Sequence, residues 1–187
     1  HPPQEHQREF IRASDEVILC SGGFRSGKTW AGAKRAIRHA LAYPGSRGFV
    51  GGVYWSSHIR GTLIPMIMQL EDPRYFEIVP RLGEHYIEIH SNNGISTIWF
   101  YPMGKEGDQS KFIHTEFDWA WIDEAVQCNE QVCKLFYPSR LSGKNGPRRI
   151  WYTTHSGGAG HWLKLWADEM GWRHIKMSTH QNQLLPE

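Results

Sequence analysis

The chain has 187 residues, 40% of them hydrophobic and 13% aromatic, which favours one packed domain over a disordered segment. Its formal net charge of +2 neither requires nor excludes a nucleic-acid partner, and its three cysteines fit a reducing compartment better than a disulfide framework. No apolar run approaches the ~18 residues of a membrane span, so we expect no membrane partner.

Helical and strand-like patterns alternate along the chain. A short helix is predicted over residues 4–13 and a strand over the apolar run 17–20, and apolar side chains then recur at helical spacing over residues 30–41. The remaining expected elements are a strand at 48–55, a helix at 58–70 kinked at Pro65, a hairpin of 85–90 and 95–101 around Asn93-Gly94, a strand at 117–122, a helix at 131–140, a strand at 149–152, a helix at 160–170 and a strand at 172–177.

Residues 22–29 read GGFRSGKT, an unbroken match to the phosphate-binding loop G-x-x-x-x-G-K-S/T. Gly22 and Gly27 allow a tight loop whose N–H groups turn inward, and the start of the next helix adds partial positive charge. Lys28 would reach the β- and γ-phosphates of ATP, and the Thr29 hydroxyl would ligate Mg²⁺. The same loop contributes four more expected nucleotide contacts: Gly23, Phe24, Arg25 and Ser26.

A strand before this loop and a helix after it are the context that the motif requires, and they disfavour an ordinary glycine-rich turn. The alternation of strands and helices predicts an α/β domain with a mostly parallel sheet flanked by helices. Together these features predict a P-loop NTPase fold of the RecA/ASCE kind, with the hairpin as an insertion. The nucleotide is expected at the carboxyl ends of the strands.

Two further strand ends carry polar residues suited to this chemistry. The apolar run 117–122 ends in Asp123 and Glu124, the Walker B arrangement, in which Asp123 would hold Mg²⁺ and Glu124 would polarise the attacking water. A Glu directly after the Asp indicates hydrolysis, although a solvated turn would be preferred for such a pair alone. Thr153 and Thr154 end another strand, where hydroxyls could sense the γ-phosphate; without the other motifs they would read as a polar loop.

In this order the motifs resemble the ATPase domain of the large terminase subunit, the DNA-packaging motor of tailed bacteriophages. The similarity runs nearly end to end. Gln7 lies in a segment similar to the adenine-recognition segment and is favoured over Gln4 by its distance from the loop. The other matching segments are the arginine-bearing loop 22–29, the helix 59–65, the Walker B segment 122–125, the coupling motif Thr153-Thr154 with Gly157-Gly158, and 182–187, similar to the segment that leaves the ATPase core.

The chain departs from the family pattern at two places. His155 stands where the coupling motif usually continues with Pro, and residues 111–115 lack the Arg-Gly that many relatives carry before Walker B. The sequence therefore does not decide which arginine is catalytic. Arg25 is the candidate within the same chain, and Arg140 is the candidate to be supplied by a neighbouring subunit. Arg148 and Arg149 are further candidates.

The resemblance implies Mg²⁺-dependent ATP hydrolysis that drives double-stranded viral DNA into a procapsid in the host cytoplasm. It implies ATP and Mg²⁺ as cofactors, the portal and the small terminase subunit as partners, and a homo-oligomeric ring when active. Residues 1–187 would be the ATPase domain of a longer protein, with a nuclease domain after residue 187. Two alternatives stay open: a helicase-type nucleic-acid-dependent ATPase, and a nucleotide-binding assembly switch with little hydrolysis.

Overall fold

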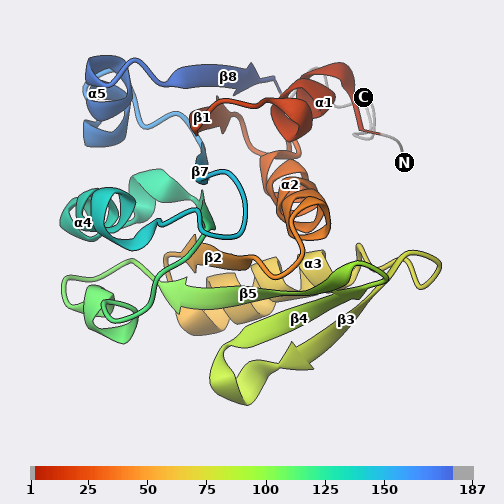
Figure 1. Ribbon diagram of the computed structural model, residues 1–187. Coiled ribbons are helices and arrows are strands. Elements are labelled where there is room, and N and C mark those ends of the chain that lie inside the picture. The colour runs from red at the N-terminus through yellow and green to blue at the C-terminus, as the bar shows by residue number, and fades with distance from the viewer. Residues whose placement is uncertain (1–2, 179–187) are drawn as a thin grey trace.

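The computed structural model describes residues 3–178, which build an eight-stranded sheet in the order β3-β4-β5-β2-β6-β7-β1-β8. Figure 1 shows the sheet running through the molecule between two layers of helices. The strands are β1 (Val17–Gly22), β2 (Arg47–Gly52), β3 (Phe76–Arg81), β4 (Tyr86–Ser91), β5 (Gly94–Pro102), β6 (Trp119–Asp123), β7 (Arg149–Thr154) and β8 (Arg173–Met177).

Neighbouring strands from β5 to β8 along this order pair in parallel. The pairs β3–β4 and β4–β5 are antiparallel, so β4 is the one described strand that runs against the others. The mostly parallel α/β fold predicted from the sequence is thereby confirmed. The hairpin around Asn93-Gly94 is more integral than expected, because its second strand, β5, pairs with β2 in the main sheet. The hairpin therefore widens the sheet instead of standing apart from it.

Strand β3 was not predicted, and the helix expected over residues 58–70 differs from its prediction. β3 is one of the two edge strands of the sheet and contains Pro80, which an edge strand tolerates because not every N–H is needed for pairing. The expected helix is instead a π-helix, η1 (Trp55–Leu63), followed by a short α-helix, α3 (Ile64–Met68). Pro65 lies in the first turn of α3, where its missing N–H costs little, so it begins a helix and does not kink one.

The helices cover the two faces of the sheet. One face packs against α1, α2 and α3, and the other against α4 and α5, which lie on opposite sides in Figure 1. Their bounds are α1 (Glu5–Arg12), α2 (Lys28–Ala42), α4 (Glu130–Arg140) and α5 (Trp162–Glu169), with 3-10 turns at η2 (Leu82–Glu84), η3 (Asp108–Lys111) and η4 (Ala125–Gln127). In the described residues, no helix is both long and apolar enough to cross a bilayer.

Strand β6 lies at the centre of the core, with all five residues buried. Trp119 and Trp121 pack into the layer of α1, α2 and α3, and Ala120 and Ile122 into the layer of α4 and α5. This alternation is the period of two expected of a strand buried on both faces. A strand so fixed delivers its last residue, Asp123, to a defined position at the carboxyl edge of the sheet.

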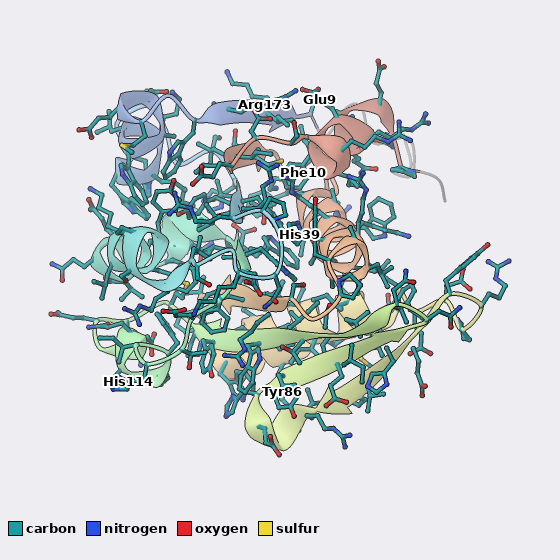
Figure 2. All side chains as sticks on the ribbon, in the orientation of Figure 1. Glu9, Phe10, His39, Tyr86, His114 and Arg173 are labelled. Carbon is teal, nitrogen blue, oxygen red and sulfur yellow. The ribbon has the colours of Figure 1, made fainter. Side chains whose placement is uncertain are left out.

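The first helix is tied to the last described strand by charged side chains at the surface. Arg173 of β8 contacts Glu9 of α1 at 2.9 Å and Asp15 at 2.8 Å, and Figure 2 shows Arg173 and Glu9 facing each other. Each of these side chains is more than a third exposed, so the pairs add little stability. They join α1 to β8, and α1 also packs against α2, the helix that begins at the end of the predicted phosphate-binding loop.

Candidate nucleotide-binding site

The loop predicted to bind phosphate connects β1 to α2. Gly27 is the residue before α2 and has φ +83°, a conformation that glycine adopts without strain. Lys28 is only 6% exposed, and its Nζ donates to the carbonyl oxygen of Gly23 at 2.9 Å. The ammonium group thus lies inside the loop, where the start of α2 also favours negative charge. This is an arrangement suited to phosphate oxygens.

Asp123 and Thr29, the two residues expected to ligate Mg²⁺, lie next to each other. The Thr29 hydroxyl lies 3.3 and 3.4 Å from the two carboxylate oxygens of Asp123, although the residues are 94 positions apart. Asp123 is 2% exposed, so the carboxylate is buried beside a hydroxyl at the end of the loop. Hard oxygen ligands of this kind are what Mg²⁺ prefers, and it commonly binds one or two protein ligands plus substrate phosphates. The residues present therefore fit a Mg²⁺ site.

Two more donors hold the same carboxylate, and one of them was not predicted. Thr153 donates from its hydroxyl to Asp123 Oδ1 and accepts from Trp121 Nε1 at 2.7 Å. His58, in η1, contacts Asp123 Oδ2 through Nε2 at 2.9 Å. No sequence motif marks His58. Its only signal is that it follows β2, whose carboxyl end lies at the same edge of the sheet.

Glu124 has a strained backbone and a histidine partner. Its φ of +49° and ψ of +42° are left-handed, a region that costs a residue with a side chain ~1–3 kcal/mol. His155 Nδ1 lies 2.9 Å from Glu124 Oε2, and the His155 ring stacks on Phe24 at a centroid distance of 6.0 Å. His155, the departure from the family pattern, thus links Walker B to the phosphate-binding loop.

The two threonines predicted as sensors both contact the Walker B segment. Thr153 is fully buried and bonded to Asp123, and the Thr154 hydroxyl accepts from the backbone N–H of Val126 at 3.2 Å. Their hydroxyls are therefore connected to the predicted site through residues 123–126, and β7 is joined to the end of β6.

Gln7 packs against the phosphate-binding loop. It is 6% exposed, and a Cβ atom built on Gly27 would lie only 2.3 Å from Gln7 Nε2. Its Oε1 accepts from the backbone N–H of Gln4 at 3.0 Å. The side chain expected to read adenine therefore lies directly beside the loop. The matching segment 182–187 falls outside the described residues.

The two arginine candidates lie in different places. Arg25 is in the loop itself and has a left-handed φ of +61°. Arg140 ends α4, where its guanidinium donates to the carbonyl of Ile113 and its own carbonyl accepts from Phe117 N–H at 2.8 Å. Phe117 precedes β6, whereas Asp123 ends it, so Arg140 lies at the edge of the sheet opposite to Lys28. Within one chain, these positions bring Arg25 but not Arg140 to the loop.

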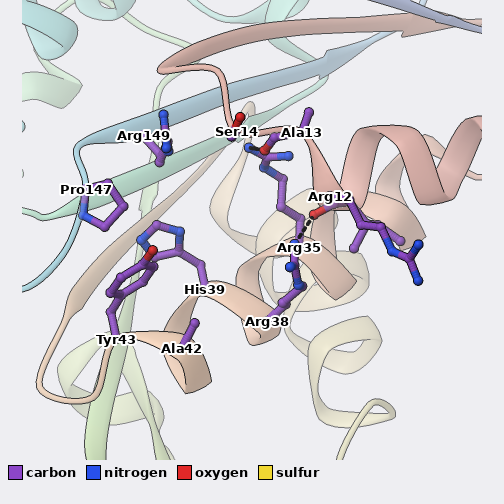
Figure 3. A pocket seen from close by; sticks show the side chains of 11 residues that line it. Arg12, Ala13, Ser14, Arg35, Arg38, His39, Ala42, Tyr43, Pro147 and Arg149 are labelled. Atoms are coloured by element: carbon purple, nitrogen blue, oxygen red, sulfur yellow. Dashed lines mark hydrogen bonds between the residues drawn. The ribbon is translucent and has the colours of Figure 1, made fainter.

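That opposite edge has a basic pocket of about 160 Å³ between the end of α1, the second half of α2 and the start of β7 (Figure 3). Arg35 is 5% exposed, and burial and then the charges of Arg149 and Arg38 lower its pKa to about 10. Burial, followed by the charges of Arg35 and Arg149, lowers the pKa of His39 to about 4. His39 is therefore neutral at pH 7.

Comparison with known proteins agrees with this geometry. The family of terminase large subunits, T4likevirus-type, N-terminal, matches residues 19–180. No curated protein matches the chain in sequence. Among solved structures, the large terminase of a thermophilic bacteriophage is 17% identical with a TM-score of 0.87, over 100% of this chain and 48% of that one. The same terminase has been solved in complex with ADP and with ATP-gamma-S.

Two other phage proteins share the fold. A mutant ATPase domain of the Thermus phage P74-26 large terminase is 16% identical, with a TM-score of 0.70 over 95% of this chain and 81% of that one. The large terminase of bacteriophage HK97 is 14% identical, with a TM-score of 0.65 over 94% and 39%. The chain spans about half the length of the first of these terminases. Since the family match covers most of its residues, the chain belongs to the family of T4likevirus-type terminase large subunits, as an N-terminal domain.

Proposed function

We propose that the chain hydrolyses ATP with Mg²⁺ and that the hydrolysis drives double-stranded viral DNA into a procapsid. The single observation that carries the proposal is the meeting of Thr29 and Asp123 next to the enclosed ammonium of Lys28. Positioning and charge neutralisation supply most of the catalysis in phosphoryl transfer. A site of this kind needs few residues, and the proximity of Lys28, Thr29 and Asp123 at one edge of the sheet supports the proposal.

Each residue has a distinct role in this proposal. Lys28 and the backbone of the loop bind the β- and γ-phosphates, and Gln7 contacts the adenine. Thr29 and Asp123 would hold Mg²⁺, which when bound neutralises phosphate charge. Glu124 accepts a proton from the attacking water, and His155 at 2.9 Å orients its carboxylate. Thr153 fixes Asp123 from the side of β7.

The catalytic arginine is proposed on the basis of position. Arg140 lies at the edge opposite to the loop of its own chain, so it would serve the site of a neighbouring subunit in a ring. Arg25 would serve its own site. Arginine fingers contribute ~10³–10⁵ in rate, so the isolated chain should be a weak ATPase if the finger comes from a neighbour. On the basis of family membership, the proposal also includes the portal and the small terminase subunit as partners and the host cytoplasm as the location.

The helicase-type motor and the assembly switch remain as rivals, and family membership favours the packaging motor over the first of them. The rate of ATP turnover distinguishes the packaging motor from the second rival, the assembly switch. We expect steady-state phosphate release from ATP only with Mg²⁺, and we expect Glu124→Gln to lower turnover by at least ~10² while ATP-gamma-S still binds. A Glu124→Gln variant that hydrolyses ATP at the original rate would refute the assignment of the base, and a wild-type chain without turnover in its assembled form would favour the switch.

A further inference from the structure

We propose that His58 is a positioning residue for the Mg²⁺ site, a role that rests on the proposed function. Its ring bridges two elements. Nδ1 accepts a hydrogen bond from the backbone N–H of Val53 at 3.0 Å, and Nε2 lies 2.9 Å from Asp123 Oδ2. Because Nδ1 is an acceptor here, the ring proton is on Nε2, which donates to the carboxylate. The contact with Val53 therefore fixes the tautomer that Asp123 requires.

The carboxylate depends on its donors for its orientation. The side-chain torsion that rotates an Asp carboxylate has a broad minimum, so hydrogen bonds set its angle. Thr153 holds Oδ1, and Oδ2 is held by His58 at 2.9 Å, while Thr29 reaches it only at 3.4 Å. Without His58, the second oxygen has no short donor, and the carboxylate can rotate away from Thr29. Partners of this kind typically change metal affinity by ~10–100-fold.

The local fold brings His58 close to β2. His58 lies in η1, and π-helical segments are frequent at functional sites. A Cβ atom on Gly52, the last residue of β2, would lie 2.9 Å from Ile59 Cγ1 and 3.1 Å from His58 Nδ1. The missing side chain at Gly52 therefore permits the close approach that puts the ring between Val53 and Asp123.

Two substitutions separate positioning from a merely structural role. His58→Asn keeps an acceptor near Nδ1 for Val53 but loses the donor to Asp123. His58→Gln keeps a donor near Nε2 for Asp123 but loses the acceptor for Val53. His90→Asn is the matched control, because His90 makes a similar contact with Glu88, at 2.9 Å, on strand β4 far from the loop.

The measurement is calorimetric binding of ATP-gamma-S at graded Mg²⁺ concentrations, with unfolding in urea alongside. We expect His58→Asn to need ~10–100-fold more Mg²⁺ for half of the Mg²⁺-dependent gain in affinity, with unchanged metal-free binding. His58→Gln should keep the wild-type Mg²⁺ requirement but unfold at lower urea, and His90→Asn should keep the Mg²⁺ requirement. A wild-type Mg²⁺ requirement in His58→Asn, or an equal defect in both variants, overturns the proposal. A wild-type chain without Mg²⁺ dependence would overturn the proposed function itself.

A different observation, the basic pocket of Figure 3, carries a second inference that is independent of the nucleotide site. Among the described residues, its lining includes four arginines, the neutral His39 and no Asp or Glu; the arginines are Arg12, Arg35, Arg38 and Arg149. Asp15 acts electrostatically on Arg35, and the buried Asp118 acts on His39, but both are also engaged elsewhere. Asp15 pairs with Arg173, and Asp118 accepts hydrogen bonds from the backbone N–H groups of Arg47 and Asn145. Within residues 3–178, Arg149 has no ion pair. Four arginines thus face two carboxylates, one of which is shared with Arg173, so the pocket keeps a net positive charge.

Arg35 and Arg38 have a structural role, but this role leaves two buried nitrogen atoms of the pocket without a partner among the described residues. Arg35 donates through its two Nη atoms to the carbonyls of Phe10 and Ala13, and Arg38 donates to that of Ile11, so both cap the end of α1. Arg35 Nε and His39 Nε2 are nevertheless buried without a partner among the described residues. Such atoms are costly to leave unpaired, and guanidinium groups match tetrahedral oxyanions well. We infer that the pocket binds a phosphate-type oxyanion.

The test uses the Lys28→Ala background, which weakens phosphate binding at the nucleotide loop, and the Arg149→Gln comparison separates any remaining effect of that loop from the pocket. Inorganic phosphate should raise the melting temperature relative to chloride at equal ionic strength. Arg149→Gln should melt higher than its parent without phosphate, because it removes a repelling charge, and should lose the response. Arg74→Gln, on an exposed arginine next to β3, should keep the response. Competition by duplex DNA would identify a backbone phosphate as the source, and its absence a free anion. No phosphate effect, or an equal effect in Arg149→Gln, overturns the inference.

Discussion

Gly32→Ala is predicted to lower the free energy of unfolding, although replacing glycine by alanine inside a helix usually raises it. In the interior of α2, alanine would normally gain about 1 kcal/mol over glycine. Here the added Cβ would lie 2.5, 2.6 and 2.7 Å from Cε2, Cζ2 and Nε1 of Trp121, distances at which something must shift. Trp121 is fully buried and its Nε1 is bonded to Thr153, so the indole has little room to move.

The magnitude follows from three contributions. Overpacking costs ~1–3 kcal/mol, and loss of the hydrogen bond from Trp121 to Thr153 costs ~1 kcal/mol. Subtracting the gain in helix propensity of ~1 kcal/mol leaves a net loss of ~1–3 kcal/mol. For a chain of this size, a loss of 2 kcal/mol lowers Tm by roughly 4–8 °C.

Unfolding in urea, followed by circular dichroism, measures this loss. Trp121→Phe provides the control, since a smaller ring leaves room for the new methyl group, and Gly32→Ala should cost less in that background. An unchanged or higher free energy of unfolding for Gly32→Ala in the wild-type background would refute the reasoning, because it would mean that α2 does not pack on Trp121 as described.

Three further predictions concern titration, thiol reactivity and the arginine. His39 should titrate near pH 4 by NMR. Because its folded pKa lies below the ordinary 6.5, the free energy of unfolding should fall as the pH is lowered from 6.5 to 4, and it should fall less in His39→Gln. A titration midpoint above pH 6 for His39 would contradict the burial described. Cys20 is fully buried with its pKa raised to about 12, and Cys128 and Cys133 are also buried, so thiol reagents at pH 8 should react only on unfolding; rapid native reaction would count against this core. If Arg140 acts on a neighbouring subunit, mixing Arg140→Ala with Lys28→Ala subunits should restore ATPase activity; a dead mixture, together with Arg25→Ala that binds but does not turn over, would assign the role to Arg25.

Much of the fold could be predicted because its signals are local. The strand, loop and helix around residues 17–42 follow from apolar spacing and a glycine-rich motif within one stretch of sequence. The edge strand β3 could not be predicted, because Pro80 breaks the strand pattern and only its pairing with β4 shows that an edge position tolerates it. The π-helix η1 likewise has no local sequence signal.

The candidate site also contains some residues that the sequence predicts and some contacts that it does not. Thr29, Asp123 and Glu124 were predictable because parallel strands bring their carboxyl ends to one edge. The contact between His58 and Asp123 joins residues 65 positions apart, and it depends on how closely Gly52 lets η1 approach. The hydroxyl of Thr153 turns toward Asp123 because Trp121 Nε1 needs an acceptor in the core. Such orientations depend on packing between elements, which sequence spacing does not contain.

The central claim is that the loop of residues 22–29 binds the phosphates of ATP. Calorimetric titration of ATP with Mg²⁺ into the wild-type chain and into Lys28→Ala tests it most directly, with circular dichroism to establish that both are equally folded. The account predicts saturable binding to the wild-type chain and loss of most of the affinity in Lys28→Ala, because the ammonium charge inside the loop is gone. Equal affinity in the two proteins would contradict it.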